Sequence, residues 1–131
     1  MKTFQLDIIT PISIQSYENI SYLRIPSLDG LTGIKSKHAN AIIALDVGEI
    51  KITIGGKDKY FATSGGFSDI KPEGVQLLLE TIEPSKSINK KRAENSLKRA
   101  QENMHNKSMN LDRAQRAIQR AKNRLKLFSR D

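Results

Sequence analysis

The segment EIKITIGGKDKYFAT, residues 49–63, carries the clearest fold signal in this chain. Within residues 49–54 every second residue is isoleucine, which is typical of a strand with one buried face and one face in water. The following pair, Gly55-Gly56, can adopt the positive φ angles of a tight turn. The segment therefore predicts a β-hairpin whose second strand lies within residues 59–63.

Outward from this hairpin, the first two thirds of the chain repeat the same kind of pattern. Short β-branched or aromatic segments recur at about ten-residue spacing and are separated by Gly and Pro breakers. The other expected strands are residues 3–9, 12–17, 20–25 and 75–82. We therefore predict that residues 1–84 form an all-β domain, an antiparallel sandwich or flattened barrel.

Residues 85–131 have helical periodicity instead. From Ser87 onward Gly and Pro are absent, and apolar residues recur at steps of three and four. The polar stretch 105–108 leaves room for a reversal, with Asn110 as N-cap of a second helix. These features predict an antiparallel two-helix hairpin. Its expected seam residues are Ala93, Leu97, Ala100, Met104, Leu111, Ala114, Ile118, Ala121, Leu125 and Phe128.

Alanine occupies four of these ten seam positions, so the two helices bury little apolar area between them. Such a hairpin is expected to depend on docking against another surface and to be able to exchange one docking site for another. We therefore predict a movable C-terminal unit.

The charge is divided unevenly between the two units. The 131-residue chain has a net charge of +8, but residues 1–85 carry 8 basic and 10 acidic side chains, whereas residues 86–131 carry 14 basic and 4 acidic ones. A basic half of this kind predicts an acidic or phosphate-bearing partner. The alternatives are a solvated helical face, or a stand-alone basic module for nucleic acid or an anionic membrane surface. Against nucleic acid, Phe128 is the only aromatic residue in the basic half, which leaves little for base stacking.

No catalytic or metal site is expected. The motifs GxxxxGK[ST] and GxSxG are absent, which argues against the usual phosphate loop and the nucleophile elbow. The chain has no Cys, and its two His residues lie one in each half. No stretch without charge exceeds ten residues, whereas a helix that crosses a membrane needs about 20 apolar residues. We expect a cytosolic, non-catalytic binding protein without a signal peptide or membrane insertion.

Several short motifs follow one another along the chain in a fixed order. They are FQLDIITP at residues 4–11, GIKSKHA at 33–39, SGGF at 64–67, LLET at 78–81 and RAKNRL at 120–125. In this order they resemble the epsilon subunit of the rotary F-type ATP synthase over nearly the whole chain. The resemblance implies a non-catalytic central-stalk subunit, peripheral to the cytoplasmic side of the bacterial cell membrane.

The resemblance also implies the partners. The β domain of such proteins contacts the gamma subunit and the c-ring, and the hairpin can extend toward the alpha and beta catalytic subunits and inhibit ATP hydrolysis. Leu31 and His38 match the positions that face gamma and the c-ring, although Leu31 stands where some relatives carry an acid. The basic residues that would meet an acidic segment of the beta subunit are Arg113, Arg116, Arg120 and Lys122.

Some members of this family bind one ATP through a motif I/L-D-x-x-R-A. Residues 88–93, INKKRA, match it except for Asn89, where the motif has Asp. The resemblance thus implies no required cofactor, with ATP as a regulatory ligand. The implied contacts are Glu83, Ile88, Asn89, Arg92, Ala93, Arg99, Arg120 and Arg124.

The spacing of the arginines fits such a ligand. Arg92 and Arg99 share one face of the first helix, and Arg120 and Arg124 share one face of the second. If those faces meet, four guanidinium groups converge, which suits a triphosphate. The alternative is that Asn89 or Ser87 is an ordinary N-cap and that the arginines serve only the inhibitory contact.

Overall fold

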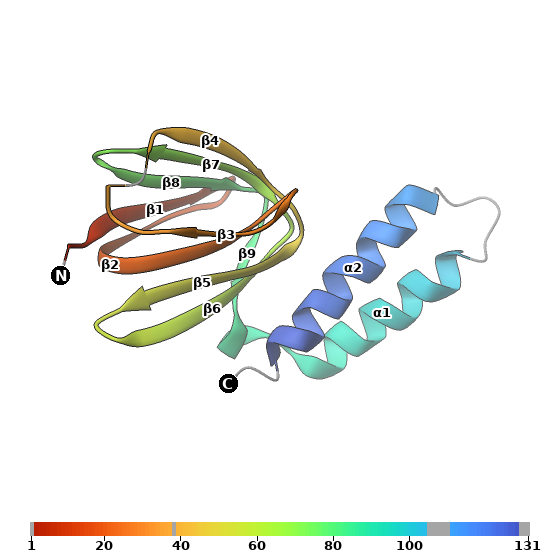
Figure 1. Cartoon of the computed structure of the whole chain (residues 1–131). Coiled ribbons are helices and arrows are strands. Elements are labelled where there is room, and N and C mark those ends of the chain that lie inside the picture. The colour runs from red at the N-terminus through yellow and green to blue at the C-terminus, as the bar shows by residue number, and fades with distance from the viewer. Residues whose placement is uncertain (1, 38, 105–110, 129–131) are drawn as a thin grey trace.

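The computed structural model describes residues 2–37, 39–104 and 111–128. Within these residues a β-sandwich is followed by two helices in contact, as Figure 1 shows, and the predicted fold class is confirmed. The strands are β1 (Phe4–Thr10), β2 (Ser13–Ser27), β3 (Gly30–Ile34), β4 (Ala41–Leu45), β5 (Gly48–Ile54), β6 (Lys57–Thr63), β7 (Gly66–Lys71), β8 (Gly74–Leu79) and β9 (Ile82–Pro84). They lead through a 3₁₀ turn, η1 (Ser85–Ser87), into α1 (Lys90–Met104) and α2 (Leu111–Phe128).

Strand β2 belongs to both layers of the sandwich. Its first half pairs with β1, and its second half pairs with β3 and β5. Between the halves, Asn19 has a φ of 61° and the register with β1 shifts, so a bulge turns the strand from one sheet into the other. The predicted strands 12–17 and 20–25 are therefore one strand with a bend.

Two further features of the sandwich differ from the expectation. Strands β1 and β8 pair in parallel, because the start and the end of the domain meet when the sandwich closes. The sequence pattern also does not predict β3, β4, β7 or β9. In β4 (AIIAL) both faces are apolar and in β3 (GLTGI) two glycines interrupt the pattern, so neither shows a clear alternation.

The predicted hairpin at residues 49–63 is present. Gly55 and Gly56, with φ of 56° and 76°, form the two-residue turn between Ile54 and Lys57. Ile50 and Ile52 of β5 point into the core between the two sheets. The other wholly buried core residues come from alternate positions of the neighbouring strands and include Leu6, Ile8, Ile20, Leu23, Ile25 and Leu77.

The helices pack along a seam of small residues. Ala93, Ala100, Ala114 and Ala121 are the buried members of the predicted seam. The prediction is wrong for Met104 and Phe128, whose side chains are exposed. The Leu111 side chain, the reversal at 105–108 and the proposed Asn110 cap lie outside the described residues.

Leu127, which is not a seam residue, is completely buried instead. It packs with Ile88, Ala62 and Tyr60, at the place where α2 lies against β5, β6 and η1. Figure 1 shows α2 between the sandwich and α1. A spacing rule for helix pairs detects only the contact between the helices, so it misses a residue that faces the sheet.

Candidate functional site

A cleft of about 500 Å³ lies where the sandwich meets the helical hairpin. Its walls come from the β1–β2 turn, from residues 80–83 around β9, and from the start of α1. Six of the eight residues predicted to contact ATP line this cleft: Glu83, Ile88, Asn89, Arg92, Ala93 and Arg124. These six residues lie up to 41 positions apart in the sequence, and the cleft also includes Thr10, which precedes Arg124 by 114 positions.

A groove of about 420 Å³ shares several of the same side chains. Arg92 and Arg124 line both cavities, and Arg99 and Lys91 line the groove. No acidic side chain is among the residues that line the groove, so its four cations offer a site for an anion. Three of the four arginines predicted to converge therefore do so.

Arg120 lies elsewhere. It lines a small pocket of about 20 Å³ together with Glu83 and Arg124, on the side of residues 62–64. It shares neither the cleft nor the groove with Arg92 and Arg99. The structure thus places Arg120 beside Arg124 but apart from Arg92 and Arg99.

Asn89 is the N-cap of α1. Its side-chain Oδ1 accepts a hydrogen bond from the backbone N–H of Arg92 (3.0 Å), and its carbonyl oxygen accepts one from the N–H of Ala93 (3.0 Å). An Asp at this position could make the same cap and would add a charge that favours the helix N-terminus. The N-cap alternative holds for Asn89, and the residue also lines the cleft.

Arg124 joins the hairpin to the sandwich. Its Nε lies 2.9 Å from Oε2 of Glu83 on β9. The side chains are 39% and 30% exposed, so solvent screens the pair and its net contribution to stability is at most about 1 kcal/mol. The guanidinium is therefore held beside the cleft by a weak interaction that an anionic ligand can compete with.

Two neighbours of Arg124 complete the attachment. The Asn123 side-chain Nδ2 donates to the carbonyl oxygen of Gly48 (2.8 Å), and Leu127 is buried against the sandwich and η1. We call Asn123, Arg124 and Leu127 the α2 anchor. All three lie in the C-terminal third of α2, so the hairpin is attached near one end.

The cleft and the groove differ in chemical character. Ile12, Ile82, Ile88 and Ala93 give the cleft an apolar part, with the carboxylate of Glu80 near it. The groove contributes cations and amides. A ligand with a flat, weakly polar body and several negative charges would match both parts.

On its outer face one sheet of the sandwich carries a band of apolar side chains, beside the polar residues Asp7, Asp69 and Gln76, and the sequence pattern did not reveal this band. Phe67 of β7 pairs with Leu78 of β8 on one side and with Ala44 of β4 on the other, while Ile9 pairs with Leu78. Ile42, two residues before Ala44, is 77% exposed. We call Ile9, Ile42, Ala44, Phe67 and Leu78 the apolar stripe. The two-sided apolar pattern of AIIAL in β4 was the available signal.

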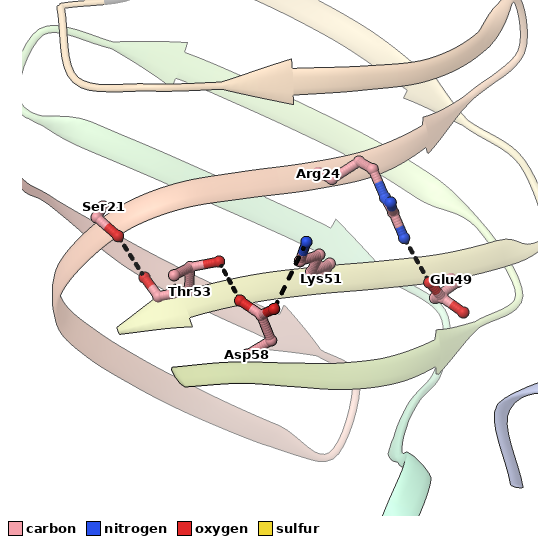
Figure 2. Close-up of polar contacts among 6 residues, drawn as sticks. All are labelled: Ser21, Arg24, Glu49, Lys51, Thr53 and Asp58. Atoms are coloured by element: carbon pink, nitrogen blue, oxygen red, sulfur yellow. Dashed lines mark hydrogen bonds and ion pairs between the residues drawn. The ribbon is translucent and has the colours of Figure 1, made fainter. Parts of the chain in front are cut away.

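The outer face of the other sheet is polar (Figure 2). The hydroxyl of Thr53 donates to Oδ1 of Asp58 (2.7 Å), whose Oδ2 lies 3.6 Å from Nζ of Lys51. The hydrogen bond from Thr53, and then the charge of Lys51, hold the pKa of Asp58 below its usual range although desolvation opposes this. Arg24 forms an ion pair with Glu49, which is buried. The two faces of the sandwich therefore differ in the surfaces they can bind.

The predicted protein contacts are placed as follows. Leu31 is exposed at the β2–β3 hairpin, and His38 lies outside the described residues. Arg113, Arg116 and Arg120 are exposed and follow steps of three and four, so they share one face of α2. Lys122 lies on the opposite side, where it lines a groove with Leu31. The structure thus separates Lys122 from the three arginines.

Within the described residues, no group of three or more His, Asp or Glu side chains is arranged to hold a metal ion. No helix of this part of the chain is long and apolar enough to span a membrane.

Two family profiles match consecutive parts of the chain. Residues 3–85 match the β-sandwich domain of the ATP synthase Delta/Epsilon chain, and residues 86–128 match the long α-helix domain of the same chain. The ATP synthase epsilon chain of Desulforamulus reducens is 36% identical over 106 residues, 81% of this chain and 80% of that one. The epsilon chain of Bacillus subtilis is 34% identical over 108 residues, 82% of each.

Solved structures share the fold. A chain of the Euglena gracilis mitochondrial ATP synthase, in an assembly of OSCP, F1 and c-ring, matches with a TM-score of 0.82 at 16% identity over 92% of this chain and 78% of that chain. A chain of the Tetrahymena thermophila central stalk and c-ring matches with a TM-score of 0.62 at 15% identity, over 98% and 96%. At these identities the likeness extends to the fold alone.

Proposed function

The chain belongs to the ATP synthase Delta/Epsilon family as an epsilon chain, and we propose that its hairpin senses ATP and inhibits ATP hydrolysis. An epsilon chain is a non-catalytic central-stalk subunit of the F-type enzyme and is peripheral to the membrane. The observation that supports this proposal is the cleft with its adjoining groove, because its walls come from both the sandwich and the hairpin. A ligand bound there would hold the two units together.

The proposed switch has two states. In the docked state, ATP would bridge Arg92 and Arg99 of α1, Arg124 of α2 and residues of the sandwich. If a ligand binds only the docked state and its free concentration is about ten times its Kd, it stabilises this state by about 1.4 kcal/mol. The ratio of docked to undocked protein then rises about tenfold. Without ATP, the α2 anchor alone would hold the hairpin.

In the undocked state, the exposed face formed by Arg113, Arg116 and Arg120 would meet an acidic segment of the beta subunit. Opposite charges attract over this surface only when the hairpin has moved, so inhibition depends on conformation. The weak attachment at one end of α2 supports this motion, because few contacts have to break.

We further propose that the sandwich binds gamma through the apolar stripe and reaches the c-ring through Leu31. Contiguous exposed apolar side chains mark protein interaction sites, and the opposite sheet offers a polar surface instead. His38, which precedes β4 of the stripe in the sequence, is a further predicted contact with gamma. Because the similar epsilon chains of Desulforamulus reducens and Bacillus subtilis are bacterial, we place this assembly at the cytoplasmic side of a bacterial membrane.

The experiment compares hydrolysis by the cognate alpha–beta–gamma core with no added subunit, with the full chain, and with a variant carrying Arg113→Gln, Arg116→Gln and Arg120→Gln. We expect the wild type to suppress hydrolysis, ATP to relieve this suppression, and the variant to bind gamma but suppress less. A matched control replaces Lys98, Lys107 and Lys126 by Gln. If wild type and variant suppress equally, the arginine face is not inhibitory; if the wild type never suppresses, the inhibitory role is wrong.

A further inference from the structure

The turn between β1 and β2 holds a large aliphatic side chain in an unusual position. Ile12 is 95% exposed, although it stands on a short turn where a polar residue or glycine is common. Ile12 contributes almost nothing to the stability of the fold, because its side chain buries almost no apolar surface. Its position next to the cleft suggests a role in binding.

The turn is held in place by the Thr10 side chain. The Thr10 Oγ1 accepts hydrogen bonds from the backbone N–H groups of Ser13 (3.1 Å) and Ile12 (3.4 Å), and it lies 2.9 Å from the Ser13 hydroxyl. A turn fixed in this way presents Ile12 in one orientation and lowers the entropy lost when a ligand binds.

Ile12 shares the cleft with other apolar side chains. Ile88 and Ala93, from the start of the hairpin, line the same cleft and are nearly buried. Ile12 does not line the cationic groove, whereas Arg92 and Arg124 line both cavities. The cleft therefore has an apolar end marked by Ile12, and a cationic end that leads into the groove.

We propose that Ile12 forms the outer wall of the base-binding half of the nucleotide site, so that the flat face of the base packs between Ile12 and the pair Ile88 and Ala93 while the phosphates enter the groove. This inference rests on the ATP site proposed above and adds a residue from the sandwich to it. Ser13 and Gln15, which also line the cleft, supply polar groups for the edge of the base. The Gln15 carboxamide oxygen already accepts a hydrogen bond from the Tyr17 hydroxyl (3.0 Å), so its NH₂ group is the end that binds.

The test measures binding of two ligands to the full chain by calorimetry: ATP, which has a base, and tripolyphosphate, which has none. Ile12→Ser is compared with wild type and with Ile14→Ser, a matched control because Ile14 is 74% exposed but does not line the cleft. We expect Ile12→Ser to weaken ATP binding about five- to tenfold, because the base would partly bury this exposed aliphatic side chain on binding, and to leave tripolyphosphate binding unchanged. Ile14→Ser should change neither.

The outcomes separate the two proposals. If the wild type binds ATP and Ile12→Ser binds it equally well, the role of Ile12 is wrong while the nucleotide site stands. Equal losses for ATP and tripolyphosphate in Ile12→Ser would also overturn the base contact, since the change would then act on the whole cleft. If the wild type binds neither ligand, the nucleotide site and the inference fall together.

Discussion

Replacing Leu127 by Ala should release the hairpin without unfolding the sandwich. Leu127 is 0% exposed and packs with Ala62 and Ile88, yet it lies at the contact between the two units rather than in the main core. The other members of the α2 anchor are one hydrogen bond, worth about 1 kcal/mol, and one screened ion pair, worth at most about 1 kcal/mol. Leu127 is therefore the strongest single contact that holds α2.

The size of the effect follows from the burial. Truncating a buried Leu to Ala costs about 2–5 kcal/mol, and the low end applies here because the boundary can close around the smaller side chain. A loss of about 2–3 kcal/mol raises the undocked population roughly 30- to 150-fold. Phe128→Ala is the control: the neighbouring ring is 41% exposed and contacts Lys90 at 5.9 Å, so its loss should cost under about 1 kcal/mol.

Amide hydrogen exchange on the full chain measures both variants. We expect Leu127→Ala to lose protection in α1 and α2, while β5 and β6 keep theirs, and Phe128→Ala to resemble wild type. If sandwich and hairpin lose protection together, the two units unfold as one and separate undocking is refuted. Equal behaviour of Leu127→Ala and Phe128→Ala would refute the role given to Leu127.

Three further predictions concern the sandwich. The Ser68 hydroxyl is completely buried in the core and has no hydrogen-bond partner in the described structure. Ser68→Ala should therefore raise the unfolding free energy, measured by urea denaturation, by about 1 kcal/mol. A lower unfolding free energy for Ser68→Ala would show that the hydroxyl does have a hydrogen-bond partner. The pKa of Asp58 is lowered, so the ionised Asp58 carboxylate stabilises the fold above the ordinary carboxyl pKa, and this stabilisation is lost as the pH falls through the lowered pKa. Thr53→Val removes the hydrogen bond to Asp58 and should raise its pKa in an NMR titration. An unchanged Asp58 titration midpoint would contradict the role given to Thr53. Phe67→Ser in the apolar stripe should weaken binding to gamma at least about tenfold while leaving the unfolding free energy within about 0.5 kcal/mol of wild type. Unaltered affinity for gamma would remove the stripe from the interface.

The sequence was sufficient to predict those elements whose hydrophobic pattern and turn residues lie close together in the chain. The isoleucine alternation and the Gly55-Gly56 turn predicted the hairpin at residues 49–63, and the alanine-rich periodicity from residue 93 predicted two helices in contact. Each depends on residues within a few positions of one another, where backbone geometry sets which side chains share a face. The family resemblance of the motif at 88–93 pointed to six of the fourteen residues that line the cleft, and the remaining lining residues include the β1–β2 turn, which the sequence did not indicate.

What the sequence determined by itself was the order of the two units, their opposite charge, and the elements whose period is regular. Only the tertiary structure decided that β2 crosses between two sheets, that Leu127 rather than Phe128 is buried, and that Arg120 lines neither of the cavities that Arg92 lines. It also brought Ile12 to the same cleft as residue 88 and placed Phe67 beside Leu78 on an outer face. The physical reason is that a periodic pattern fixes which residues share a face, but the partner that covers the face comes from distant segments. Whether a side chain is buried depends on which distant segment packs against its face, and a local sequence pattern does not specify that segment.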